Sequence, residues 1–316
     1  MENKHLLSLS YGKDSLACLG AIEQLGWPLD RIVHAEVWAT DTIPADLPPM
    51  VEFKAKADKI IKERWGIEVE HLCATKDGER LTYEKLFYHI PKRKESTAEK
   101  FKGGVQGFPT ITRPWCNGHL KRPTLRMALP KKFMVQETQR RDLSSDSPSS
   151  EDSGARATSN TGFSKAAARG DAKNTVQYLG IAADEPERIA RHTKPGFRMP
   201  LVELGWDEAY CRKWCEENDL LSQIYTTTTR GGCWFCHNQG VGQLRLLRKN
   251  YPEYWALMLK WDLDSPVTFK PDGHTVHDFE RRFALEDAGW IMPDERFKWS
   301  YLDEQQIDVF ALLRRL

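Results

Sequence analysis

The sequence lacks a long apolar run: no stretch of about 18 consecutive apolar residues occurs, so no transmembrane helix is predicted. The first residues, MENKHLL, do not have the charged and then apolar layout of a secretion signal, and we expect none. Only seven cysteines occur in 316 residues, and an odd number in so long a chain does not indicate a disulfide scaffold. These absences predict a cytoplasmic globular protein whose cysteines serve as thiols or metal ligands.

Net charge is also nearly absent. The formal charge is +1, so the chain as a whole is not a polycation. The charge is unevenly spread, however, because residues 92–132 contain eleven lysines and arginines and two glutamates, which leaves nine net positive charges. Such a stretch is either a solvated basic loop or a positive surface that faces an anionic substrate or a nucleic acid. Composition alone leaves both interpretations open.

Apolar segments alternate with helical patterns in the first part of the chain. Strands are predicted at residues 5–10, 31–40, 67–72 and 175–181, and helices between the first three strands at residues 14–25 and 49–65. This alternation implies parallel strands joined by right-handed crossovers. We therefore predict an α/β fold with a doubly wound, mostly parallel sheet. Further helices are predicted at residues 207–218, 240–250, 252–263, 277–288 and 302–316.

Residues 138–174 interrupt this pattern. Ser, Thr, Gly, Ala, Asp and Arg dominate the segment, and Phe163 is its only aromatic residue. Such a composition cannot bury enough apolar area to offset the entropy lost on ordering, so we predict a flexible insertion. The predicted organisation is an α/β domain over residues 1–205, which carries the insertion, and a mainly helical region over residues 206–316.

A predicted buried strand meets a predicted helix at residues 10–15, SYGKDS. Backbone N–H groups at a helix N-terminus are unpaired, and the helix dipole adds positive potential there. Gly12 permits close approach to the backbone, Lys13 supplies a positive charge, and the two serine hydroxyls are hydrogen-bond donors. The simpler interpretation is an ordinary helix cap formed by Asp14 or Ser15. Neither G-x-x-x-x-G-K-S/T nor G-x-G-x-x-G is present.

These six residues resemble the S-x-G-x-D-S loop of the PP-loop ATP pyrophosphatase superfamily. That superfamily binds the pyrophosphate of ATP, or a sulfonucleotide, at this turn. The nucleotide-binding positions implied by the resemblance are Ser10, Tyr11, Gly12, Lys13, Asp14 and Ser15. The commoner form has glycine where this chain has Tyr11, and a side chain there predicts a negative φ.

Four later segments resemble, in the same order, the phosphoadenosine phosphosulfate (PAPS) reductase branch of that superfamily. They are residues 40–49, similar to D-T-G…F-P-E-T with Ile43 in place of glycine; 115–123, similar to C-T…L-K…P; 177–188, similar to Y-x-G-I-R-x-D-E-x-x-R; and 200–207, similar to P-L…W. With the loop, the resemblance covers roughly residues 5–240. It implies an adenine nucleotide alpha hydrolase-like fold and a nucleotide site shared by Lys13, Asp41, Lys121 and Arg188.

Residues 231–237, GGCWFCH, contain a second pattern with chemical meaning. A C-x-x-C turn lets two sulfurs reach one metal, and the preceding glycines permit the turn. Zinc, an iron–sulfur cluster and a redox dithiol are all compatible with it, the dithiol ranking third because no thioredoxin-like context precedes it. The resemblance places Cys116 at the active-site edge of the sheet. The candidate metal ligands are Cys116, Cys233 and Cys236, with His119 and His237 as candidates for a fourth.

The other four cysteines are assigned mainly to the core. Cys211 and Cys215 are four residues apart on one predicted helix, so they could meet one site, but that helix also carries aromatic residues and cysteine is often buried. Cys18 and Cys73 lie in the predicted first helix and third strand. Some PP-loop sulfurtransferases hold a 4Fe–4S cluster by three cysteines and leave one iron open, and a Cys3His zinc site suits the same residues here.

The resemblance implies an enzyme that binds Mg²⁺ and ATP, or a nucleotide such as PAPS or adenylyl sulfate (APS), and adenylates a substrate for transfer of sulfur or an amine. Lys13, Lys121 and Arg188 are then expected to stabilise the developing negative charge. One alternative is a true PAPS reductase, although such enzymes carry a tail cysteine and none follows Cys236. A second is a non-catalytic module that binds a nucleotide. A nucleic-acid acceptor recruited by residues 92–132 is a further expectation. No membrane partner is expected, and the oligomeric state is open.

Overall fold

The computed structural model describes residues 4–92, 103–127, 175–227, 231–293 and 299. The predicted insertion at 138–174, the predicted helix at 302–316 and part of the basic stretch lie outside these ranges. No described helix is both long and apolar enough to cross a bilayer. Tertiary contacts divide the chain into two compact units, each of which is made of segments that alternate along the sequence. We instead predicted two regions with one boundary after residue 205. The first unit comprises Met1–Val37, Pro48–Arg80 and Gly118–Gly231, and the second Trp38–Leu47, Leu81–Asn117 and Gly232–Leu316.

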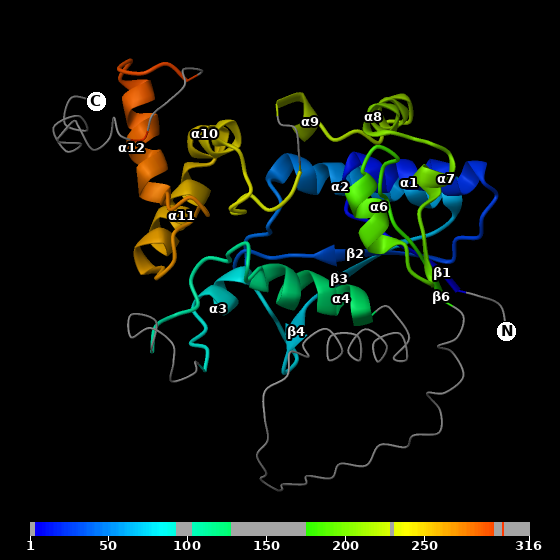
Figure 1. The fold of residues 1–316 in the computed structure, drawn as a ribbon, viewed down its shortest axis with the longest axis horizontal. Coiled ribbons are helices and arrows are strands. Elements are labelled where there is room, and N and C mark those ends of the chain that lie inside the picture. Colours follow the sequence, from blue (N-terminus) through cyan, green and yellow to red (C-terminus); the bar gives the residue numbers. More distant parts are fainter. Residues whose placement is uncertain (1–3, 93–102, 128–174, 228–230, 294–298, 300–316) are drawn as a thin grey trace, which may run out of the picture. The chain divides into compact units, whose positions relative to one another are not determined.

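The first unit contains a five-stranded parallel sheet of order β3-β2-β1-β6-β7 (Figure 1). Its strands are β1 (Lys4–Ser8), β2 (Arg31–Glu36), β3 (Val69–Cys73), β6 (Thr175–Tyr178) and β7 (Phe197–Arg198). The predicted α/β fold with a parallel sheet is confirmed. Strand β7 is absent from the sequence prediction because two residues show no periodicity.

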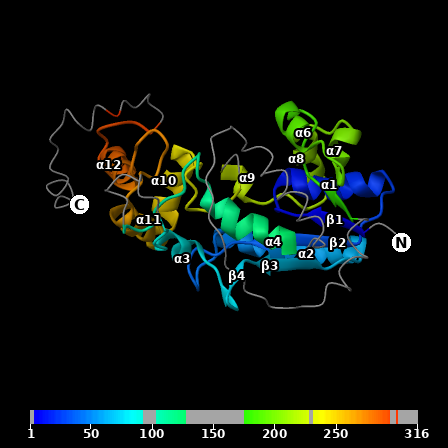
Figure 2. The same cartoon turned by 60° about the horizontal axis from the view of Figure 1, so that its bottom comes forward.

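Helices cover both faces of this sheet, as a parallel sheet requires. They include α1 (Lys13–Gln24), α2 (Pro48–Trp65) and α4 (Arg122–Met127). Leu7 of β1 shares a buried core with residues of α1 and α2, whereas its neighbour Leu6 points to the other face, in the cluster that includes Leu125 of α4. Successive strand residues alternate between faces, so β1 is apolar on both. Figure 2 shows α4 lying along β2 and β3, with which it is in contact.

Several shorter elements complete the first unit. They are the hairpin of β4 (Thr75–Lys76) and β5 (Glu79–Arg80), and the helices α6 (Pro186–His192), α7 (Pro200–Glu203), α8 (Glu208–Glu217) and α9 (Ile224–Thr227). Asp207 caps α8, since its side chain accepts from the Tyr210 amide at 2.7 Å. Helix α8 packs closely on α1 at Gly20, where a Cβ would lie 2.2 Å from the Trp214 ring.

The second unit is helical and rich in aromatic side chains. Its helices are α3 (Tyr83–Phe87), α10 (Val241–Asn250), α11 (Pro252–Asp264) and α12 (Val276–Asp287). The last three confirm the predicted helices to within one residue at each end. Trp261 of α11 is buried, and its ring stacks on Trp234 with 5.7 Å between centroids. Aromatic packing of this kind supplies much of the core around the C-x-x-C segment.

Candidate functional site

The predicted phosphate loop lies at the carboxyl end of β1. Strand β1 ends at Ser8 and α1 begins at Lys13, so the residues between them turn from strand to helix. The strand order reverses at β1, because the chain continues to β2 on one side and returns to β6 on the other. Open α/β sheets bind ligands at the carboxyl end of the strands where the order reverses. The fold therefore positions this loop where a ligand is expected.

The N-cap residue of α1, Gly12, has no side chain and offers no acceptor of that kind to the amides of the first turn. The Lys13 amide of this turn donates to the Tyr225 hydroxyl at 3.4 Å. The simpler interpretation, a cap formed by Asp14 or Ser15, is wrong. Ser15 is buried, its Oγ donates to the Gly12 carbonyl at 2.9 Å, and it accepts from the Ser10 amide at 3.2 Å. The Ser15 hydroxyl thus stabilises the loop by hydrogen bonds to its backbone.

Tyr11 overturns one prediction, since its φ is +56° and not negative. A left-handed conformation costs a residue with a side chain about 1–2 kcal/mol. Its contacts offset this cost: the side chain is completely buried, the ring lies 4.9 Å from that of His34, and the hydroxyl hydrogen-bonds Asp58. The hydroxyl also lies 3.1 Å from Nε2 of His71. These contacts attach the loop to α2 and to the sheet.

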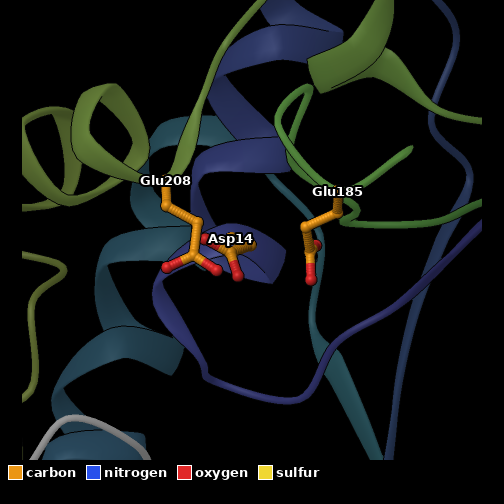
Figure 3. Close-up of side chains that lie close together, drawn as sticks. All are labelled: Asp14, Glu185 and Glu208. Atoms are coloured by element: carbon orange, nitrogen blue, oxygen red, sulfur yellow. The ribbon is translucent and has the colours of Figure 1, made fainter. Parts of the chain in front are cut away.

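Three carboxylates gather at the start of α1 (Figure 3). Asp14 lies in the first turn of α1, Glu185 precedes α6, and Glu208 begins α8. One oxygen from each lies within 4.8 Å of the others, and among the described residues this is the only such set of three acidic, cysteine or histidine groups. The sequence gives no signal for this cluster, because its members come from three separate elements.

Two of the predicted cationic residues contact this acidic cluster. Lys13 Nζ lies 2.9 Å from Asp14 and 2.9 Å from Glu208, and Arg188 Nη1 lies 2.6 Å from Glu185. Burial opposes the charge of Lys13, but the hydrogen bonds to its two carboxylates outweigh burial and raise its pKa. Burial raises the pKa of Asp14 as well, and the neighbouring carboxylates add to this effect while Lys13 opposes it. The carboxylates therefore outnumber the cations that pair with them.

Gly180, just after β6, allows a close approach to the loop. A Cβ at this position would lie 2.7 Å from Cα of Ser15 and 2.9 Å from the carbonyl oxygen of Asp14. Real Cβ atoms do not come so near to backbone atoms, so only glycine fits without displacing the loop. The segment that resembles Y-x-G-I-R thus contacts the predicted phosphate loop directly.

The structure places the other two predicted nucleotide-site residues as follows. Lys121 is an exposed residue of the first unit, at the end of the π-helical turn Asn117–Lys121. Asp41 belongs to the second unit, where its carboxylate pairs with Lys85 at 2.8 Å. Of the four predicted cationic and acidic residues, Lys13 and Arg188 are the two that the structure brings to one cluster.

In the second unit the three predicted cysteine ligands lie in the neighbourhood of Tyr83. The Tyr83 ring contacts sequence neighbours of the cysteines, namely Trp115 at 4.9 Å and Phe235 at 4.1 Å between centroids. Burial, and then the nearby thiols of Cys116, Cys236 and Cys233, raise the pKa of Tyr83. Trp115 and Phe235, which are more than a hundred positions apart in sequence and adjacent to two of the cysteines, therefore both contact the Tyr83 ring.

The C-x-x-C segment forms a tight turn. The Cys236 amide donates to the Cys233 carbonyl at 3.1 Å, and Gly232 before it has a φ of +131°, which glycine adopts readily. Lys270 Nζ donates to the carbonyl of His237 at 2.7 Å, which fixes the exit from the turn. His237 is buried in this unit, whereas His119 is exposed and belongs to the first unit.

The donor set suits a thiolate-bound metal group. Two sulfurs on a single zinc ion lie about 3.8 Å apart, given a Zn–S distance of about 2.3 Å and tetrahedral geometry. Within the described ranges no three thiol or imidazole groups lie within 4.8 Å of one another. Tyr83 Oη and Trp115 Nε1 are buried donors for which the described part of the chain provides no acceptor. Cysteine thiolates are ligands of both zinc ions and iron–sulfur clusters, and either group would be an anionic acceptor for these donors.

The remaining cysteines are core or strand residues, as predicted. Cys18, Cys211 and Cys215 are buried, and burial raises the pKa of Cys211 to about 12. The Cys215 thiol donates to the backbone carbonyl of Lys13 at 3.2 Å. Cys73 ends β3, and its thiol donates to Glu36 at 3.3 Å. Burial and these partners favour the protonated thiol over a metal-bound thiolate.

No protein-family model, curated protein or solved structure matches this chain. The class that the structure defines is an α/β protein with a five-stranded parallel sheet and a helix-rich second unit. Assignment of the chain to a family within this class depends on the resemblance of the loop and of the four later segments, together with the geometry of the two candidate sites.

Proposed function

We propose that this chain is a PP-loop enzyme with an adenine nucleotide alpha hydrolase-like fold, which binds ATP or a sulfonucleotide and adenylates a substrate for transfer of sulfur or an amine. The single observation that carries the proposal is the start of α1, with Gly12 as its N-cap, at the carboxyl end of β1, where the strand order reverses. The backbone amides at this helix start, of which that of Lys13 donates to the Tyr225 hydroxyl at 3.4 Å, suit the pyrophosphate portion of a nucleotide together with the helix dipole.

The acidic cluster supports a divalent cation as part of the same site. Carboxylate oxygens are ligands that Mg²⁺ prefers, and Mg²⁺ usually binds one or two carboxylates together with substrate phosphates. Asp14 and Glu208 are the residues that would hold it, beside the loop that would hold the phosphates. Bound there, Mg²⁺ would supply positive charge to the phosphate oxygens.

The chain's own groups account for the remaining chemistry of the first step. A substrate oxygen attacks the α-phosphorus, the bond from that phosphorus to the bridging oxygen breaks, and pyrophosphate leaves with the electron pair. Lys13, Arg188 and the amides of the first turn of α1 would stabilise the charge that develops on the phosphate oxygens. Exposed Lys121 is a third candidate for this role. A sulfur or amine nucleophile then displaces AMP from the adenylated substrate.

The cysteine site is proposed to hold a metal group through Cys116, Cys233 and Cys236, either a 4Fe–4S cluster or Zn²⁺. A cluster held by three cysteines supplies an iron site that can bind sulfur. The residues of the turn orient two of these thiols, and Lys270 fixes the backbone that follows them.

Nucleotide binding is the first test of this proposal. Calorimetry with ATP and Mg²⁺ should show binding to the parent chain, and Lys13→Met should weaken it at least tenfold because an ion pair to phosphate is lost. Lys56→Met is the matched control, since Lys56 is an exposed lysine of the same unit whose partner is Asp219. Equal ATP affinities of the parent and the Lys13 variant would contradict the assignment of the loop.

Turnover separates the proposed enzyme from its alternatives. Pyrophosphate release from ATP in the presence of sulfide, thiol, amine or nucleic-acid acceptors is the expected result. Sulfite released from PAPS with a thiol donor would instead identify a reductase, and nucleotide binding with no turnover on any acceptor would favour a binding module. Neutralising the basic residues at 92–102 tests the nucleic-acid acceptor: unchanged binding of RNA and DNA would exclude this role of the stretch.

A further inference from the structure

Tyr83 has a buried hydroxyl with no partner among the described residues. The residue is the first of α3 and is 1% exposed, and its Oη makes no hydrogen bond within the described ranges. The backbone fixes its position: the Tyr83 amide donates to the Trp38 carbonyl at 2.8 Å, and Thr82 caps the helix. A buried hydroxyl without a partner is unfavourable. Phenylalanine would fill the same space at lower cost, so the hydroxyl itself requires an explanation.

The surroundings of Tyr83 leave few acceptors for this hydroxyl. Its ring is in contact with four other aromatic rings, those of Phe87, Trp115, Phe235 and Trp261. Aromatic faces are weak acceptors. Two of these rings belong to residues directly adjacent in sequence to Cys116 and Cys236, which brings the cysteine sulfurs into the same neighbourhood.

We propose that the Tyr83 hydroxyl donates a hydrogen bond to a cysteine sulfur of the metal centre formed by Cys116, Cys233 and Cys236, and is a positioning residue for that centre. The inference rests on the metal group advanced under Proposed function. It adds a specific donor from α3, an element outside both cysteine segments.

A metal-bound thiolate is a better acceptor for this hydroxyl than a protonated thiol. A protonated thiol is a weak acceptor, whereas a metal-bound thiolate carries negative charge and accepts a strong, charge-assisted hydrogen bond. Metal binding deprotonates the thiols. Metal binding thus creates a better acceptor for the Tyr83 hydroxyl.

The test is Tyr83→Phe in the full chain, purified without oxygen and stripped of metal by a chelator. In the metal-free protein we expect an unchanged or higher melting temperature, because the variant removes a buried group that has no partner. Co²⁺ is the probe for the loaded state, followed by its thiolate-to-cobalt absorption. The variant should bind Co²⁺ about 10–100-fold more weakly, as is usual when a group that hydrogen-bonds a ligand is removed. In reconstituted iron–sulfur protein, its reduction potential should be lower.

Tyr254→Phe is the matched control, because the Tyr254 ring stacks on Trp234 in the same unit at 4.9 Å and no cysteine contributes to its pKa. It should leave Co²⁺ affinity unchanged. If the parent chain itself shows no thiolate–metal absorption with Co²⁺ or iron, the metal centre and this inference both fail. If the parent binds metal and Tyr83→Phe binds it equally well, this inference alone fails. A Tyr83→Phe protein that melts at a clearly lower temperature without metal would also overturn it.

Discussion

Restoring glycine at position 11 should destabilise this protein, although glycine is the commoner residue in loops of the kind it resembles. Tyr11→Gly relieves a left-handed conformation that costs about 1–2 kcal/mol. It also removes a completely buried aromatic side chain, and large-to-small substitutions of this type cost about 3–5 kcal/mol. Glycine adds an entropic cost of roughly 0.5–1 kcal/mol. The free energy of unfolding should therefore fall by about 1.5–5 kcal/mol.

The measurement is urea unfolding of the parent and the variants, followed by tryptophan fluorescence and compared at equal slope. Tyr11→Phe separates the two contributions: it keeps the ring against His34 and loses the hydrogen bonds to Asp58 and His71, so it should cost about 1–2 kcal/mol. A Tyr11→Gly protein at least as stable as the parent would refute the argument that burial and these hydrogen bonds hold the strained conformation.

Three further outcomes are expected. Gly180→Ala should displace the loop and weaken ATP binding at least tenfold in calorimetry, whereas Gly242→Ala, which meets no atom within 4 Å, should not. Burial, and then the charge of Lys54, lower the pKa of His34 from its ordinary 6.5 to about 3. The neutral imidazole therefore contributes stability that is fully present above pH 6.5 and is lost on acidification. In urea unfolding the free energy of unfolding should fall by about 2 kcal/mol between pH 7.5 and 5. His34→Gln should remove this pH dependence. Cys236→Ser should lower the metal content measured by atomic emission after oxygen-free purification, and Cys18→Ser should not.

The hydrogen bonds of His34 explain why the neutral form is the folded one. Its Nε2 lies 2.8 Å from Nζ of Lys54, which is only a donor, so Nε2 must accept and carry no proton. Its Nδ1 then carries the proton and donates to the carbonyl of Leu9 at 2.8 Å. A protonated imidazole would lose the first of these bonds. The bond from Nδ1 to the Leu9 carbonyl is kept on protonation, so acid should lower stability through the buried charge and the lost bond to Lys54.

Periodicity predicted the regular part of this fold well. Strands such as β2 and helices such as α2 are long enough to show a pattern, and their apolar residues lie where the pattern requires them. The short elements α3 and β7 were not predicted, because two to five residues carry no readable period. The way the two units alternate along the chain also has no local signal, since it depends on which segments pack together.

The candidate sites show the same difference between local and tertiary features. Residues that are adjacent in sequence, such as the loop at 10–15 and the pair Cys233 and Cys236, were predicted from spacing. Groups assembled from separate elements were not, as the meeting of Glu185 and Glu208 with Asp14 and of Tyr83 with sequence neighbours of the cysteines shows. The conformation of Tyr11 was predicted wrongly because the general steric rule applied, and the burial that overrides it is a tertiary contact.

The net charge of the acidic cluster affects how strongly the loop is expected to bind an anion. Three carboxylates and two paired cations, Lys13 and Arg188, leave one net negative charge beside the start of α1. A nucleotide alone would meet that charge and would have to compete for both cations. A divalent cation on the carboxylates reverses the net charge and leaves Lys13 available to phosphate. ATP should therefore bind far more weakly when Mg²⁺ is replaced by a chelator, whereas a helix start with a purely structural role would show no nucleotide binding that Mg²⁺ could change.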